Sequence, residues 1–136
     1  MILENLQDPG NLGTMIRTGE GAGITGVIMN QQTVDIFNPK TIRATMGSIF
    51  RVPFVYVPEL SPVLTQMNEK GIHTYAAHLK GQKYYDSFSF REPTAFLIGN
   101  EGNGLTKEIS DQAGQYLKIP MEGKVESLNA RSQRLF

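Results

Sequence analysis

The stretch TAFLIGNEGNGLTKEISDQAGQYLKIPMEGKVESLN, residues 94–129, contains two short apolar runs, and each run ends in a turn. Thr94–Ile98 has the β-branched and aromatic content of a buried strand, and the glycine-rich run 99–104 prevents its continuation. Residues 117–119 form the second run, which Pro120 ends. Ligands bind where the strands of an open α/β sheet end, so the two turns predict one ligand site.

A short helix is expected between the two runs. Thr106 is a competent N-cap for a helix that continues to about Ala113. Gly114 is expected to end it, because glycine tolerates the left-handed conformation that follows many helices. The second turn, residues 121–123, is followed by Ser-Leu-Asn at 127–129, which adds a hydroxyl and an amide to the predicted site.

Glycine-rich turns are also common connectors without a ligand, and this turn alone does not decide between the two interpretations. Its glycines have the spacing G-x-x-G-x-G, whereas the dinucleotide-binding fingerprint is G-x-G-x-x-G with an acidic residue about twenty positions later. The chain also has no G-x-x-x-x-G-K-[ST] loop for nucleoside triphosphates. Neither a dehydrogenase nor an enzyme with such a loop is expected.

The composition is that of one globular domain, because 136 residues with 40% hydrophobic content suffice for a single core. The 13 basic residues balance the 13 acidic residues, so net charge does not attract the chain to nucleic acid or to an anionic membrane. The absence of cysteine excludes disulfides, thiolate metal sites and thiol nucleophiles. No membrane-spanning run or signal-peptide pattern occurs, so the expected location is the cytoplasm.

Upstream of residue 94, predicted strands alternate with predicted helices. Short apolar runs predict strands at residues 1–6, 27–29, 52–57 and 72–77. Helices are expected from Asn11 to about Gly21, from Asn38-Pro39 to about Met46, and from Ser61-Pro62 to Gly71, each opened by a capping residue. This alternation predicts an α/β fold with a mostly parallel sheet and helices on both faces.

The first predicted helix carries Leu12, Met15 and Ile16 on one face, which is expected to pack on the sheet. Glycines lower its intrinsic stability by up to about 1 kcal/mol each. We therefore expect close packing against a strand at the glycines of this region, Gly19, Gly21 and Gly23.

Several polar side chains are candidates for chemistry, and each also has an ordinary role. Asn11 and Arg17 are six residues apart, so periodicity alone does not place them on one helix face, although both could border one cavity. A helix cap and a surface ion pair are their ordinary roles. His73 and His78 lack further ligands at metal spacing, and Ser127 lacks an evident histidine base, so metal binding and serine hydrolysis are not expected.

Three ordered motifs point to one family. The first is DPGNLG at 8–13 with IRT at 16–18, the second is IGNEGNGL at 98–105, and the third is IPM at 119–121 with SLN at 127–129. Together they resemble the SpoU/TrmH family of RNA 2′-O-ribose methyltransferases, which belongs to the SPOUT class. The resemblance covers nearly the whole chain, and three motifs in order are far more specific than any one of them.

The resemblance implies a C-terminal trefoil knot, S-adenosylmethionine as cofactor, a homodimer, and ribosomal or transfer RNA as substrate, with no metal and no membrane. It implies cofactor-binding roles for Ala77, His78, Gly99, Asn100, Glu101, Gly102, Ile119, Pro120, Met121, Ser127, Leu128 and Asn129. It implies catalytic roles for Asn11, Arg17, Glu101, Ser127 and Asn129.

The chemistry implied is methyl transfer from a sulfonium to a ribose 2′-hydroxyl, which depends mostly on positioning and electrostatics. Arg17 is expected to hold the hydroxyl or a nearby phosphate, because a guanidinium rarely deprotonates in proteins. Glu101 is expected to support Arg17 or Asn11 through a charge-assisted hydrogen bond. A glycine is expected at 99 because a side chain would intrude where the backbone approaches the ligand.

Two features depart from the family pattern. Residues 130–136, ARSQRLF, stand where the family usually has an apolar helix rich in small residues, so we expect this helix to be truncated or altered. The chain begins at the first strand of the catalytic domain, so an N-terminal RNA-recognition domain is expected to be absent. The alternative hypothesis is a catalytically impaired module of the same fold that binds the cofactor or RNA.

Overall fold

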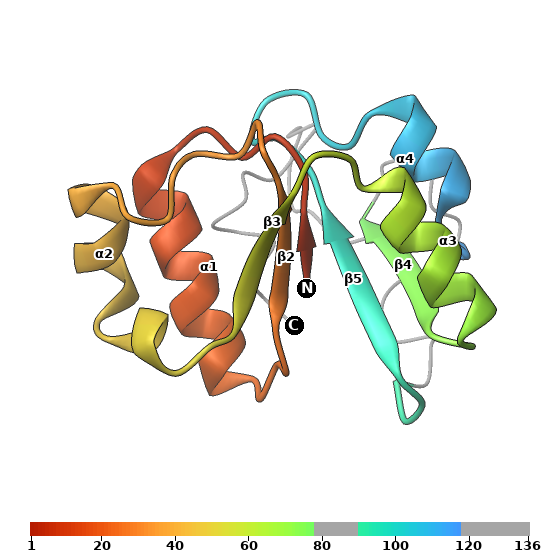
Figure 1. Ribbon diagram of the computed structural model, residues 1–136, viewed down its shortest axis with the longest axis horizontal. Helices are drawn as coiled ribbons and strands as arrows, with labels where there is room; N and C mark the ends of the chain where they lie inside the picture. Colours follow the sequence, from red (N-terminus) through yellow and green to blue (C-terminus); the bar gives the residue numbers. More distant parts are fainter. Residues whose placement is uncertain (78–89, 118–136) are drawn as a thin grey trace, which may run out of the picture.

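The computed structural model describes residues 1–77 and 90–117, which form a parallel six-stranded sheet with helices on both faces (Figure 1). The predicted fold class is confirmed, while the implied trefoil knot concerns residues outside the described ranges. The strands are β1 Ile2–Leu3, β2 Val27–Asn30, β3 Phe54–Val57, β4 His73–Ala77, β5 Thr94–Ile98 and β6 Gln115–Leu117. The helices are α1 Pro9–Gly21, α2 Pro39–Thr45, the 3₁₀ helix η1 Ser48–Phe50, α3 Ser61–Glu69 and α4 Lys107–Gln112.

The order of the strands creates a switch point in the middle of the sheet. The order is β3-β2-β1-β5-β4-β6, and all pairs are parallel. From β1 the chain runs outward to β3 and then crosses to the other half of the sheet, where β5 pairs with β1, with Leu3 opposite Ile98. A crevice is expected at the carboxyl ends of strands that flank such a point.

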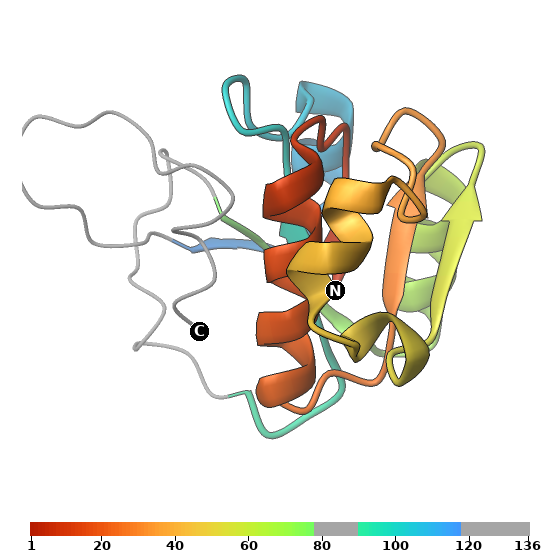
Figure 2. The same cartoon turned by 90° about the vertical axis from the view of Figure 1, so that its left-hand side faces the viewer.

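Two apolar layers hold the helices on the sheet. On one face Leu12 and Ile16 of α1 pack against strand residues such as Met29, as the helical periodicity predicts. On the other face Leu64 of α3 and Ile109 of α4 pack against β4 and β5. Full burial of one such side chain contributes about 1.5–3 kcal/mol. Figure 2 shows α1 and α2 side by side over the first face.

Helix α1 begins one turn earlier than expected, and its N-cap is Asp8. Asp8 Oδ1 accepts a hydrogen bond of 2.9 Å from the backbone N–H of Asn11. The prediction that Asn11 caps this helix is therefore wrong. Proline suits the first helical position because it has no N–H to leave unpaired, so Pro9 places the cap at the residue before it.

Replacing Asp8 by alanine is expected to destabilise the protein by about 1 kcal/mol, which lowers the Tm by about 4 °C. The substitution removes the oxygen that accepts the Asn11 N–H. Asp8→Asn keeps an oxygen at that place and serves as the matched control. Thermal unfolding of the three proteins checks the assignment, and equal Tm values for wild type and Asp8→Ala would contradict it.

Two other element boundaries differ from the predictions. Helix α3 begins at Ser61, but its N-cap is Leu60 without a side-chain capping bond, so Ser61 does not cap the helix. Strand β3 begins at Phe54, so Val52 and Pro53 precede the strand instead of belonging to it. Within the described residues, no helix combines the length and the apolar character needed to cross a membrane.

The glycines have different roles from one another. An added Cβ at Gly19 would lie 2.4 Å from a side-chain carbon, so the expected close packing is confirmed there. Gly21 and Gly23 have nothing within 4 Å, and Gly23 instead takes a left-handed φ of +79° after α1. Gly114 was predicted to be left-handed, and this prediction is wrong, because its φ is not positive. Its N–H instead donates to Thr74 Oγ1 at 2.7 Å, and an added Cβ would crowd the Thr74 carbonyl oxygen.

Candidate functional site

Three asparagines join the carboxyl ends of β1, β2 and β5. Asn5 has a left-handed φ of 56°, which asparagine tolerates better than most residues. Its N–H donates to Asn30 Oδ1 at 2.9 Å, and Asn30 Nδ2 donates back to Asn5 Oδ1 at 2.8 Å. Asn100 Nδ2 donates to the Asn5 carbonyl oxygen at 2.8 Å. These bonds fix the strand ends at the switch point relative to one another.

A buried carboxylate anchors the far end of the glycine-rich loop to β1. Glu4 is 5% exposed, and its two oxygens accept hydrogen bonds from the Thr106 N–H at 2.7 Å and the Thr106 hydroxyl at 2.9 Å. The Thr106 side chain also caps α4, as predicted. Burial of a charge is costly unless it is hydrogen-bonded, and both Glu4 oxygens are. The glycine-rich loop is thereby fixed to β1 after its last residue, through Thr106, as well as near its first, through Asn100.

The loop at 99–104 is closed by its own hydrogen bonds. Asn100 Oδ1 accepts from the N–H groups of Gly102 at 2.9 Å and Asn103 at 3.0 Å. The backbones of Asn100 and Gly104 bond to each other in both directions. A Cβ at Gly99 would lie 2.1 Å from the Gly104 carbonyl carbon. The loop's own backbone therefore already requires glycine at this position, and the predicted approach of a ligand to Gly99 stays a prediction.

Glu101 connects this loop to the segment that leads into α1. Its carboxylate accepts hydrogen bonds from the Gln7 N–H at 3.0 and 3.2 Å and from the Asp8 N–H at 2.9 Å. Within one chain Glu101 does not bond to Arg17 or Asn11, because among the described residues its partners are these two backbone groups. Support of the Arg17 of a second copy stays a prediction. The first and second sequence motifs are thus in direct contact at the carboxyl edge of the sheet.

The two predicted polar residues of α1 have opposite environments. Asn11 is 8% exposed in the first turn, whereas Arg17 is exposed more than one turn further along the helix. The ion pairs found among the described residues do not include Arg17, so its ordinary role in a surface ion pair is not observed there. In the described part of the chain, no ion pair therefore fixes the guanidinium.

The predicted cofactor-binding segments follow neighbouring strands. Ala76 pairs with Leu97, and Ala77 pairs with Leu117, so β5, β4 and β6 end at one edge. Ala77 is half-buried at that edge, next to the start of the glycine-rich loop. The remaining predicted site residues lie outside the described ranges: His78, Ile119, Pro120, Met121, Ser127, Leu128 and Asn129.

A cavity of about 850 Å³ opens at the opposite edge of the sheet. It is lined at the amino ends of the strands by residues that include Gly26, Pro53 and Thr94. None of the predicted catalytic or cofactor-binding residues within the described ranges lines it. The hydrogen-bonded polar groups and the switch point favour the carboxyl edge as the functional site.

Sequence reasoning missed Glu4, Asn5 and Asn30 as part of this edge. A signal was present, because Glu4 and Asn5 come directly after the apolar pair Ile2-Leu3, and Asn30 comes directly after the predicted strand at 27–29. Polar residues at strand ends are the positions where α/β sheets build sites. The partners could not be predicted, since the contacts join residues 25 or more positions apart.

Replacing Asn100 by alanine is expected to reduce stability by about 1–2 kcal/mol, because it removes three hydrogen bonds of the loop. Asn100→Asp is the matched control: it keeps the acceptor for the two loop N–H groups, and it replaces the bond to Asn5 by a contact between a carboxylate oxygen and the Asn5 carbonyl oxygen. Chemical denaturation should rank the proteins wild type, Asn100→Asp, Asn100→Ala. Equal stability of wild type and Asn100→Ala would show that these bonds contribute nothing.

The chain is similar to known RNA methyltransferases. The model of the SpoU rRNA Methylase family matches residues 1–132. The chain is 36% identical over 129 residues to the 23S rRNA (guanosine(2553)-2′-O)-methyltransferase RlmP of Bacillus subtilis (strain 168), covering 95% of this chain and 52% of that protein. It therefore spans about half the length of this relative.

Two solved structures show the same architecture. The SpoU methyltransferase AviRb from Streptomyces viridochromogenes, in complex with the cofactor AdoMet, aligns with a TM-score of 0.90 at 30% identity over 98% of this chain and 52% of that one. An AdoMet-bound rRNA methyltransferase from Sinorhizobium meliloti aligns with a TM-score of 0.88 at 36% identity, over 98% of this chain and 51% of that one. The chain belongs to the SpoU rRNA methylase family.

Proposed function

We propose that the chain transfers a methyl group from S-adenosylmethionine to a ribose 2′-hydroxyl of ribosomal or transfer RNA. One observation carries the proposal: Glu101 and the glycine-rich loop meet the entrance of α1 at the switch point of the sheet. This is where an α/β fold binds its ligand. Family membership and the AdoMet complexes of two similar structures support the same cofactor here.

The residues at this edge fit a nucleoside cofactor. Ala77 and the loop glycines offer little or no side chain, so a flat ring can lie directly against the strand ends. The loop is held rigid by Asn100 and Glu4, which keeps that surface preformed. The residues proposed to hold the cofactor are Ala77, His78, Gly99, Asn100, Glu101, Gly102, Ile119, Pro120, Met121, Ser127, Leu128 and Asn129.

When bound, S-adenosylmethionine would supply a methyl group on a positive sulfur for transfer to the ribose oxygen, with the neutral thioether as leaving group and the hydroxyl proton lost to solvent. The protein's task is to align these atoms and to stabilise the oxygen as it loses its proton. We assign the stabilising positive charge to Arg17, and the orientation of the ribose to Asn11, Ser127 and Asn129. Glu101 holds the entrance of α1 in place through Gln7 and Asp8.

A homodimer is part of the proposal. Arg17 comes eight residues after Pro9, which is about 12 Å along the helix axis. Glu101 binds the residues just before Pro9, so Arg17 of the same chain lies well away from it. A second copy of the chain would bring its Arg17 to this edge. The C-terminal trefoil knot and a cytoplasmic location, where RNA substrates occur, complete the proposal.

Methyl transfer to RNA transcribed in vitro tests the function. The protein is incubated with S-adenosylmethionine and unmodified ribosomal or transfer RNA transcripts, and the digested nucleosides are analysed by mass spectrometry. The expected product is a nucleoside methylated on the ribose, with one S-adenosylhomocysteine formed per methyl group. Calorimetry measures cofactor binding in parallel. Binding without transfer would support the alternative of a catalytically impaired module, and a methylated base would contradict the assigned chemistry.

A further inference from the structure

We propose that the outer face of α2 and η1, beside Arg17, binds the phosphate backbone of the substrate RNA. This RNA-binding face consists of Lys40, Arg43 and Phe50, and the inference rests on the proposed function. All three residues are exposed. Phosphate contacts position a nucleic acid without reading its sequence, and they are made mainly by lysine and arginine.

The packing of α2 on α1 places this face next to the proposed site. Thr41 Oγ1 of α2 donates to the Pro9 carbonyl oxygen at 3.0 Å. A Cβ on Gly10 would lie 3.5 Å from Lys40 Cε, and a Cβ on Gly13 would lie 2.4 Å from the Thr41 carbonyl oxygen. Lys40 therefore lies at the entrance of α1, close to the segment that Glu101 holds.

Arg17 and Arg43 extend the positive charge along the same seam between the helices. Residues three or four apart lie on one side of a helix. Gly10, Gly13 and Arg17 follow that spacing on the side of α1 that packs against α2. Arg43 follows Lys40 by three residues, so the two cations share one side of α2. The result is a row of cations that leads away from the proposed site.

The acids that flank this face, Asp8 and Asp35, form no ion pair with it among the described residues. The segment from residue 36 to residue 58 contains Lys40, Arg43 and Arg51 and no acidic residue. Arg51 pairs with Glu20, and its hydrogen bond, with one from Ser48, holds the pKa of the Glu20 carboxyl below its ordinary value. The ion pairs among the described residues include neither Lys40 nor Arg43. No described side chain therefore holds either cation of α2 in an ion pair.

The opposite layer has the reverse charge balance. Helices α3 and α4 carry the acids Glu69, Glu108 and Asp111 and one cation, Lys107, which pairs with Asp111. The described part of a chain with no net charge is thus polarised, with its basic side over α1 and α2. A polyanion would approach from that side.

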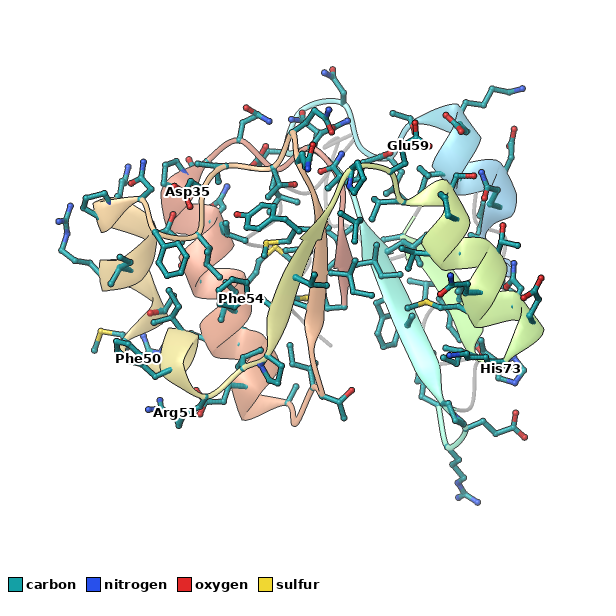
Figure 3. The ribbon with its side chains drawn as sticks, in the orientation of Figure 1. Asp35, Phe50, Arg51, Phe54, Glu59 and His73 are labelled. Atoms are coloured by element: carbon teal, nitrogen blue, oxygen red, sulfur yellow. The ribbon has the colours of Figure 1, made fainter. Side chains whose placement is uncertain are left out.

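An exposed aromatic ring completes the face. Phe50 is 87% exposed and stands on the outer side of η1, next to Arg51 (Figure 3). Unpaired RNA bases stack on exposed aromatic rings beside basic residues, so Phe50 is assigned to stacking. Met46 is also 67% exposed nearby, and a protein partner would bury it together with Phe50. The exposed cations of α2 favour RNA, and a protein partner is an outcome of the test.

A double variant, Lys40→Ala with Arg43→Ala, tests the inference. The matched control removes two cations from the other layer, Lys70→Ala with Lys107→Ala. Binding to unmodified RNA transcripts is measured over a range of salt concentrations, together with the kinetics of methyl transfer and cofactor affinity. We expect the double variant to weaken RNA binding about tenfold and to reduce the salt slope by about two, with kcat and cofactor affinity unchanged. Lys40→Arg with Arg43→Lys should restore binding.

Three results would overturn the inference: equal RNA binding by the double variant and wild type, equal losses in the double variant and the control, or a change of oligomeric state in the double variant. The last result would assign the face to a protein contact. The test is separate from that of the proposed function. If the wild-type protein binds RNA through Lys40 and Arg43 but transfers no methyl group, the proposed function is refuted while the assignment of the RNA-binding face still holds.

Discussion

Replacing Arg17 by alanine is expected to reduce kcat for methyl transfer by at least about a hundredfold, the usual effect of removing one donor that stabilises a developing anion. Arg17 is exposed and takes part in none of the ion pairs among the described residues, so its loss should leave the fold intact. Cofactor affinity should change little, because the groups assigned to the cofactor lie at the strand ends. Single-turnover kinetics and calorimetry measure the two quantities separately.

Arg17→Lys is the matched control for this experiment. Lysine keeps the positive charge but not the planar set of donors, so it should recover only part of the rate. Unchanged Tm in both variants would confirm that the effect is not structural. An Arg17→Ala protein with wild-type kcat would remove Arg17 from the mechanism.

Replacing Gly99 by alanine is expected to destabilise the protein by about 2–3 kcal/mol and to abolish cofactor binding. The new Cβ would lie 2.1 Å from both the Gly104 carbonyl carbon and the Leu105 nitrogen. These are backbone atoms that cannot rotate away, so the loop must open. Because the loop also carries Glu101, the contacts to Gln7 and Asp8 should be lost as well.

Gly102→Ala is the matched control for stability, in the same loop. Its Cβ would meet only Asn100 Oδ1 at 3.6 Å, which is an ordinary contact, and its φ is not in the left-handed region. Chemical denaturation should therefore show a large loss for Gly99→Ala and almost none for Gly102→Ala. Similar stability of the two variants would contradict the description of the loop as closed on itself.

The sequence predicted the layered architecture because local signals and hydrophobic periodicity agreed along the chain. Asn38-Pro39 opens α2 as expected, with Asn38 Oδ1 accepting from the Lys40 N–H at 2.9 Å. The same rule was available for Asp8-Pro9, where two competent caps, Asp8 and Asn11, lie close together and proline selects the first.

The site was predicted less completely than the fold. The motif residues Glu101 and Gly99 were identified, but their partners depend on strand register and on contacts between distant segments. Glu101 meets residues 94 and 93 positions away, and no local propensity encodes such a pairing. The role of Gly99 depends on how the loop closes five positions later, at Gly104. Physical rules predict these residues' importance more readily than their contacts.

The central claim is that the carboxyl edge at the switch point, where residues 99–104 meet the entrance of α1, binds S-adenosylmethionine. Backbone amide NMR of the labelled protein during titration with the cofactor tests it most directly. The account predicts the largest shift changes in the loop at 99–104, at Ala77 and at residues 5–8, with smaller changes elsewhere. Changes confined to the opposite edge, near Gly26 and Thr94 at the cavity, or no changes at saturating cofactor, would contradict it.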